Sequence, residues 1–217
     1  MTSTSKRLVL RVLLLGMPLA GMSLAGMSLA GRSLGVPAAA SAQTGQRPGG
    51  LPSADPQHAF DWEHGSWAVR LSRLVRPLSG SEEWVAYEGT SVVRPVWDGL
   101  ANLGELDVAG PAGRIVGMSL RLYDPGSEQW RIHWANRSDG EVGEPMVGGF
   151  SGGRGEFYNY EPFDGRVVLV RFVFSDIAER SFRFEQSFSD DHGRTWEANW
   201  IAEFSRTAGP DGRVPGT

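Results

Sequence analysis

Turn signals recur about every 12 residues along this chain, and this spacing constrains the fold more than any other feature. They are found at 77–81, 98–99, 109–113, 124–127, 138–141, 151–153, 164–165, 176–180 and 189–196. The runs between them are short and rich in Val, Ile, Phe, Trp and Tyr, as is typical of β-strands. These runs cover 68–74, 84–93, 117–123, 130–135, 146–150, 155–160, 166–175, 181–188 and 195–204. No window after Gly65 shows a sustained 3.6-residue period, so this part of the chain is expected to be all-β.

Consecutive strands joined by short turns form an antiparallel meander. An open meander of this length would leave two exposed edges, whereas closure into a barrel removes both of them. The sequence therefore predicts one domain over residues 55–206, a single antiparallel up-and-down barrel of about eight to ten strands. A short N-terminal helix is expected from Asp55 to His64, because Asp55 can serve as its N-cap and Pro56 suits its first turn.

The first 42 residues have the pattern of a signal peptide. Three basic residues within the first 11 precede an apolar run, and Ala40-Ser41-Ala42 forms an A-x-A cleavage site. This predicts a secreted or periplasmic protein that begins at Gln43 and keeps no stable membrane association. An uncleaved anchor is the alternative, because Val12–Gly31 carries no charge. Residues 43–54 and 207–217 are rich in Gly and Pro and are expected to be a disordered linker and a disordered tail.

Charge and composition exclude several kinds of chemistry. Of the 21 Lys and Arg residues, 17 lie after residue 42 together with all 25 Asp and Glu, which gives the mature chain a net charge of −8. This charge argues against nucleic acid as a partner. The absence of Cys excludes thiol nucleophiles and thiolate metal sites, and the one lysine, Lys6, lies in the signal region, so a Schiff base is excluded too. The four His residues are too scattered for a metal site, and no cofactor is expected.

The turn from Ser189 to Trp196 carries the most specific motif of the chain. It reads S-x-D-x-G-x-T-W, which is the spacing of an Asp-box hairpin. Asp191 is expected to accept hydrogen bonds from amides of the turn, and Gly193 to take the positive φ that the bend requires. Asp-boxes also occur in sialidase propellers, but those repeat the box from blade to blade, and this chain has one copy. The motif indicates a hairpin and no chemistry.

The two strands that flank this turn predict which residues face the interior. If Phe188 lies opposite Trp196, then Phe184 lies opposite Trp200, and all four rings share one face because side chains alternate with period two. Rings of this size gain so much from leaving water that this face is expected to point inward.

Several segments carry a resemblance to a known family. They are Gly65-Ser66-Trp67 after the short helix, Leu122-Tyr123-Asp124-Pro125 before Trp130, Trp134-Ala135-Asn136, and the Asp-box that runs into Trp196-Glu197-Ala198-Asn199-Trp200. Together they resemble a bacterial family of lipocalin-like, calycin-type barrels of unknown function. The resemblance implies a barrel and supplies no catalytic residues. In lipocalins an arginine of the last strand lies across the G-x-W tryptophan, which implies a structural contact between Arg206 and Trp67.

Three polar residues are candidate anchors for a ligand inside the barrel. Glu88 shares a face with Trp84, His133 is the side chain best suited to proton transfer near neutral pH, and Arg171 stands in an apolar row. The full set of candidate ligand-binding residues is Glu88, His133, Trp134, Arg171, Phe184 and Trp200. Arg121 is placed with the polar residues opposite the aromatic face, where it would either line a cavity or pair with neighbours in solvent.

The sequence leaves the function open between two classes. The preferred interpretation is an exported protein that binds a small apolar or aromatic molecule in its barrel. The alternative is a cofactor-independent enzyme, such as a cyclase or isomerase, that uses Glu88, His133 or Arg171. A barrel with a filled interior would leave only a structural role.

Overall fold

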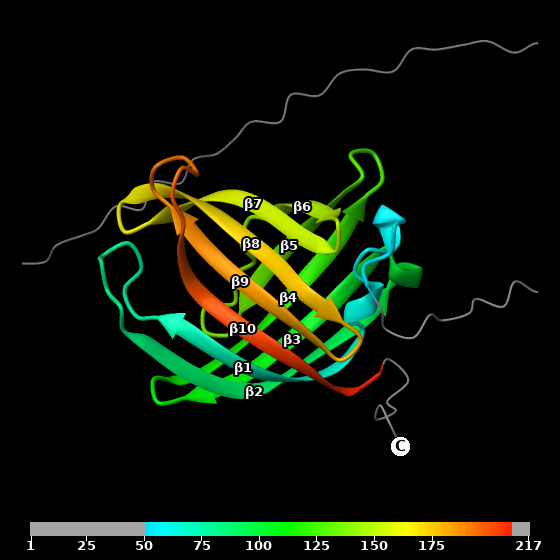
Figure 1. Cartoon of the computed structure of the whole chain (residues 1–217), viewed down its shortest axis with the longest axis horizontal. Coiled ribbons are helices and arrows are strands. Elements are labelled where there is room, and N and C mark those ends of the chain that lie inside the picture. The colour runs from blue at the N-terminus through cyan, green and yellow to red at the C-terminus, as the bar shows by residue number, and fades with distance from the viewer. Residues whose placement is uncertain (1–50, 210–217) are drawn as a thin grey trace, which may run out of the picture. The chain divides into compact units, whose positions relative to one another are not determined.

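The computed structural model of the protein describes residues 51–209. Ten strands form one closed antiparallel barrel, in which each strand pairs with its neighbours in sequence and β10 pairs with β1 (Figure 1). The strands are β1 (Gly65–Leu74), β2 (Trp84–Val96), β3 (Ala101–Gly110), β4 (Gly113–Asp124), β5 (Gln129–Asn136), β6 (Met146–Ser151), β7 (Arg154–Phe163), β8 (Arg166–Ala178), β9 (Ser181–Ser189) and β10 (Glu197–Ala208). The predicted all-β, up-and-down barrel is confirmed. The predicted signal peptide lies outside the described residues.

β3 is the strand that the distribution of large apolar residues does not reveal. Its sequence, ANLGELDVAG, is composed mostly of small and acidic residues. It nevertheless pairs with β2 from Glu88 to Val96 and with β4 along its whole length. Gly104 leaves room for Ser119, whose Oγ would lie only 2.8 Å from a Cβ at position 104. Pairing on both sides forms this strand even though its own composition is a weak signal.

The helix expected from Asp55 to His64 is instead a pair of single 3₁₀ turns, η1 (Pro56–His58) and η2 (Asp61–Glu63). The Asp55 side chain does cap the first turn by accepting a hydrogen bond from the Gln57 amide at 3.1 Å. The second turn starts anew at Phe60, and both Phe60 and Trp62 are buried. Two turns allow side chains two residues apart to point inward, which one regular helix does not. A third turn, η3 (Trp97–Gly99), joins β2 to β3, and no helix within residues 51–209 is long and apolar enough to cross a membrane.

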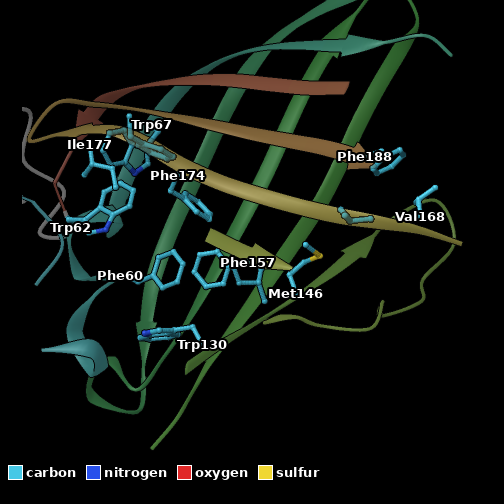
Figure 2. Packing of buried hydrophobic residues seen from close by; sticks show 13 residues of the cluster. Phe60, Trp62, Trp67, Trp130, Met146, Phe157, Val168, Phe174, Ile177 and Phe188 are labelled. Carbon is cyan, nitrogen blue, oxygen red and sulfur yellow. The ribbon is translucent and has the colours of Figure 1, made fainter. Parts of the chain in front are cut away.

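The segment with η1 and η2 fills one end of the barrel, which we call the closed end. The Phe60 ring lies at its centre, with ring centroids 5.1 Å from Trp130, 4.8 Å from Phe150 and 5.4 Å from Phe174. Figure 2 shows Phe60 beside Phe157, with Trp130 and Trp62 nearby. The contacts with Trp130, Phe150 and Phe174 are edge-to-face and the contact with Phe157 is stacked, and together they bury large aromatic area at fixed geometry. The N-terminal segment therefore acts as a plug of side chains rather than as a cover.

The wall of the barrel is incomplete between β5 and β7. β6 pairs with only three residues of β5, Trp130–Ile132, and with five of β7, Arg154–Tyr158. Beyond these pairs both neighbouring strands continue toward the end opposite the plug. There the segment between β5 and β6 returns alongside β5, with the Gly143 amide donating to the Trp134 carbonyl at 2.9 Å. The inward residues of β7 beyond Tyr158 thus have strand neighbours on the β8 side alone.

Candidate ligand cavity

A cavity of about 210 Å³ lies inside the barrel, above the plug. Side chains from every strand except β6 line it, together with Glu63 of the plug. The apolar lining consists of Val69, Leu71, Leu106, Ile132, Trp134, Phe172, Phe174, Phe184, Trp200, Ala202 and Phe204, and the polar lining of Glu63, Ser91, Glu105, Ser119, Arg121, Glu161 and Gln186. Trp134, Phe184 and Trp200 are only half-buried, so protein atoms leave part of each ring uncovered. An apolar cavity with a few polar groups is typical of a small-molecule site.

A second hollow, of about 460 Å³, lies between residues 52–59 and the turn that joins β6 to β7. Most residues around it are exposed or half-buried, among them Ala54, Ser151 and Gly152. Despite its larger volume it is a depression in the outer surface. The cavity inside the barrel is therefore the candidate site.

A buried ion pair joins the plug to the wall of the cavity. The Arg121 guanidinium donates two hydrogen bonds to the Glu63 carboxylate, one of them 3.0 Å from Nη2 to Oε1, and a third to Asn102 Oδ1 at 3.3 Å. The two charged side chains are 8% and 3% exposed. Burial raises the pKa of the Glu63 carboxyl, and the Arg121 guanidinium opposes that rise. Arg121 also lies over the Phe60 ring, 4.7 Å from its centroid, so the pair forms the polar floor of the cavity.

Sequence reasoning missed this pair. It placed Arg121 opposite the aromatic face, yet Arg121 points inward beside Ser119, and its neighbour two residues on, Tyr123, packs against Trp130 of the core. Arg121 and Tyr123 lie on one face of the same strand, so the aromatic Tyr123 could have indicated that Arg121 points inward. Nothing in the sequence around Glu63 indicates a partner 58 residues away.

The contact between Trp67 and Arg206 that the resemblance implied is present at the closed end. The guanidinium carbon of Arg206 lies 4.0 Å from the centroid of the Trp67 ring. The same guanidinium donates to the carbonyls of Glu179 at 2.8 Å, His64 at 2.6 Å and Trp62. The Trp67 indole donates to the Glu63 carbonyl at 2.8 Å. Arg206 thus ties the first and last strands to the plug, which is a structural role.

His64, next to the ion pair, links the stability of the closed end to pH. Burial, together with the charges of Arg121 and Arg206, lowers the pKa of its imidazole from 6.5 to about 4. The folded protein therefore binds fewer protons than the unfolded chain between these two values. We expect this residue to cost up to about 3 kcal/mol of folding free energy as the pH falls from 6.5 to 4.

The measurement is the free energy of unfolding against pH for the wild type and for His64→Gln. The wild type should lose more stability over this interval, because the variant cannot take up a proton at that position. His133→Gln, on the outer face, is the control and should retain the wild-type slope. Parallel curves for the wild type and His64→Gln would contradict the expectation.

Glu161 is the cavity carboxylate that the structure leaves without a partner. It lies on β7 beyond the reach of β6, opposite Val168 of β8. No hydrogen bond or ion pair from another residue within 51–209 reaches its carboxylate. Burial raises the pKa of this carboxyl, and no neighbouring charge offsets the rise. An unpaired acidic group in a largely apolar cavity is costly, so it merits a functional explanation.

The six candidate ligand-binding residues divide into two groups. Trp134, Phe184 and Trp200 line the cavity. Glu88, His133 and Arg171 lie on the outer face, which corrects the expectation that they are interior anchors. The reason is strand alternation, because each of the three follows an inward residue, respectively Tyr87, Ile132 and Val170.

The outer positions of these three residues account for their contacts. Glu88 is 77% exposed and lies 3.6 Å from Arg70, and His133 Nδ1 lies 3.1 Å from the Gly143 carbonyl oxygen. Glu88 does share a face with Trp84, as expected, but Trp84 itself is exposed. The Arg171 guanidinium lies 4.3 Å from the centroid of the Trp196 ring on the outside of the barrel.

A β-bulge at Asn199 changes the predicted register of the last hairpin. The structure pairs Glu197 with Phe188, Trp200 with Gln186 and Ala202 with Phe184, with the irregularity between Ala198 and Trp200. One extra residue in a strand reverses the alternation beyond it. Trp200 therefore faces the cavity while Trp196 faces outward, which corrects the prediction that both rings share the inner face.

The turn that connects β9 to β10 has the hydrogen bonds expected from its sequence. Asp191 accepts from the amides of Arg194 at 3.0 Å and Thr195 at 2.9 Å, and from the hydroxyls of Ser189 and Thr195. These bonds, chiefly those from Thr195, lower the pKa of the Asp191 carboxyl. Gly193 has φ +84°, as predicted. Both oxygens of this carboxylate accept hydrogen bonds from the turn, so Asp191 holds the hairpin together.

Comparisons with known proteins add little to this description. No protein-family model matches the chain, and no curated protein matches it. Among solved structures, a redesigned β-barrel, mFAP0 bound to DFHBI, is similar, with 10% sequence identity and a TM-score of 0.37. The match covers 66% of this chain and 97% of that one. A likeness of this size carries no argument about function.

Proposed function

We propose that this protein is an exported barrel that binds a small, largely apolar or aromatic molecule in the cavity above the plug. The observation that carries the proposal is a cavity of about 210 Å³ in which three inward rings, Trp134, Phe184 and Trp200, are incompletely covered by protein. Each 40 Å² of ring surface that a ligand removes from water contributes about 1 kcal/mol to binding. A filled interior would have supported a structural role instead.

Kinship with the lipocalin-like barrels belongs to the same proposal. It is supported by the plug before β1, by Arg206 across Trp67, and by the Asp-box pattern of hydrogen bonds at Asp191. Export rests on the sequence of the first 42 residues, and N-terminal sequencing of the protein recovered from an exporting host tests it directly. The enzyme alternative relied on Glu88, His133 and Arg171 as catalytic groups inside the barrel. These residues lie outside the cavity, so they no longer support it.

Tryptophan fluorescence is the direct test of binding, because Trp134 and Trp200 lie in the cavity wall. We expect at least one of three probes that share an aromatic ring and a short chain, 4-phenylbutanol, 4-phenylbutylamine and 4-phenylbutyrate, to give a saturable change in emission. Ala202→Phe places a ring in the cavity and should weaken this binding at least about tenfold, since it removes the space the probe occupies.

Ala68→Phe is the matched control for that variant, because Ala68 is exposed on the same side of the barrel, on β1 next to β10. It should bind as the wild type does. Absence of saturable binding for all three probes would overturn the proposed function. Unchanged binding in Ala202→Phe would show that the probes bind elsewhere.

A further inference from the structure

We propose that the ligand carries a cationic amine and that Glu161 of β7 is its anchor. This inference deepens the proposed function and rests on it, because it names the class of molecule that the cavity takes, an apolar or aromatic amine. It stands on the charges, the acceptors and the rings that surround the cavity.

The charges in the cavity do not balance without a ligand. Arg121 and Glu63 neutralise each other through their two hydrogen bonds. Glu105 borders the cavity, but its carboxylate pairs with Arg94 at the exposed surface. Glu161 is the carboxylate that remains, and among residues 51–209 no cation pairs with it. The lining of the cavity therefore carries one uncompensated negative charge, which a cation would neutralise and an anion would double.

Among the polar groups that line the cavity and have no partner within residues 51–209, the Ser91 and Ser119 hydroxyls can donate or accept, Arg121 Nε is fully buried, and the others are acceptors. The Gln186 amide nitrogen donates to Asn199 Oδ1 at 2.8 Å, which leaves the Gln186 carbonyl oxygen for the cavity. Ser91 and Ser119 add hydroxyl oxygens that can also accept. The Arg121 guanidinium, which a carboxylate ligand would require, gives its hydrogen bonds to Glu63 and Asn102, and its remaining donor, Nε, is fully buried. A ligand that donates hydrogen bonds fits this set better than one that accepts them.

The remaining walls favour an organic cation over a metal ion. Calcium and magnesium need about six oxygen ligands, whereas most residues that line this cavity are apolar. No group of three metal-ligating side chains occurs within residues 51–209. The lining contains the indole rings of Trp134 and Trp200, in contrast, and an ammonium group is attracted to the face of such a ring. A protonated amine on an apolar skeleton satisfies both the carboxylate and the rings.

Isothermal titration calorimetry with the same three probes tests the inference. The purified protein should bind 4-phenylbutylamine at least about tenfold more tightly than 4-phenylbutanol, and 4-phenylbutyrate more weakly than either, because a hydrogen bond between charged groups is about twice as strong as a neutral one. Glu161→Gln should reduce the affinity for the amine to that for the alcohol and leave the alcohol unaffected. Glu88→Gln, an exposed carboxylate on the outer face, should change neither affinity.

Each outcome distinguishes this inference from the function it rests on. Equal affinities of the amine and the alcohol, or an amine affinity that survives Glu161→Gln, would overturn the amine inference and leave the proposed binding function intact. Failure of all three probes to bind would overturn both. Retained binding of the alcohol shows in the same experiment that Glu161→Gln is folded and that its cavity is intact.

Discussion

Replacement of Arg121 by Met is expected to lower the free energy of unfolding by about 3–5 kcal/mol, because it leaves the Glu63 carboxylate charged and unpaired in the interior. Asn102 would lose a hydrogen-bond donor at the same time. Arg121 approaches the rings of Phe60 and Phe174, so its loss also loosens the packing of the plug. Urea denaturation followed by tryptophan fluorescence measures the change.

Two further variants show whether the buried charge is the cause. Arg114→Met removes an arginine of the same strand whose two hydrogen bonds to Asp107 lie at the exposed surface, and it should leave the denaturation midpoint almost unchanged. The double variant Glu63→Met with Arg121→Met removes both charges and should recover stability to within about 2 kcal/mol of the wild type. If Arg121→Met is as stable as Arg114→Met, Arg121 does not stabilise the fold by neutralising the buried Glu63 carboxylate.

Replacement of Arg206 by Met is expected to cost a similar amount or more, at least about 4 kcal/mol. Three buried carbonyls, those of Trp62, His64 and Glu179, would lose their donor, each at about 1–3 kcal/mol, and the Trp67 ring would lose its cation. Arg206→Lys should recover only a small part of this loss, because an ammonium group cannot reach three acceptors in the plane of a guanidinium.

Near-ultraviolet circular dichroism should report the same change locally, since the environment of Trp67 is set by this contact. The control is Arg70→Met on β1, where the side chain is 81% exposed and its partner Glu88 lies 3.6 Å away. Its effect on stability should be small. An Arg206→Met variant no less stable than Arg70→Met would contradict the role assigned to Arg206 at the closed end.

The architecture could be predicted from the sequence because it depends on features that are local in the chain. The spacing of turns and the absence of a helical period are visible in any window, and closure follows from the need to pair the edge strands. β3 was not predicted, because its small residues form a strand through pairing with β2 and β4 rather than through their own β-propensity. The N-terminal segment was predicted only in part: a helical segment was expected, but its division into two turns was not, because packing inside the barrel positions Phe60 and Trp62.

The residues that line the cavity could be predicted only on strands whose aromatic residues lie on the inward face of the strand alternation. This holds for β9 and β5, where Phe184 and Trp134 face inward. It does not hold for β7, where Tyr158 and Tyr160 face outward and Glu161 faces inward. On β10 a single bulge residue, Asn199, separates the faces of Trp196 and Trp200. A one-residue irregularity cannot be read from composition, yet it decides which side chains meet a ligand.

The contact between Arg206 and the His64 carbonyl joins residues that are 142 positions apart in the chain. The seam between β1 and β10 is therefore the most non-local pairing in the barrel, and forming it requires closing a loop that contains all the other strands. During synthesis, the first nine strands have no closing partner until the last one is made. Until then β1 and β9 present unpaired edges, which is the state in which such a chain is most exposed to aggregation. β10, the last strand to be made, pairs with both edges and so closes the barrel.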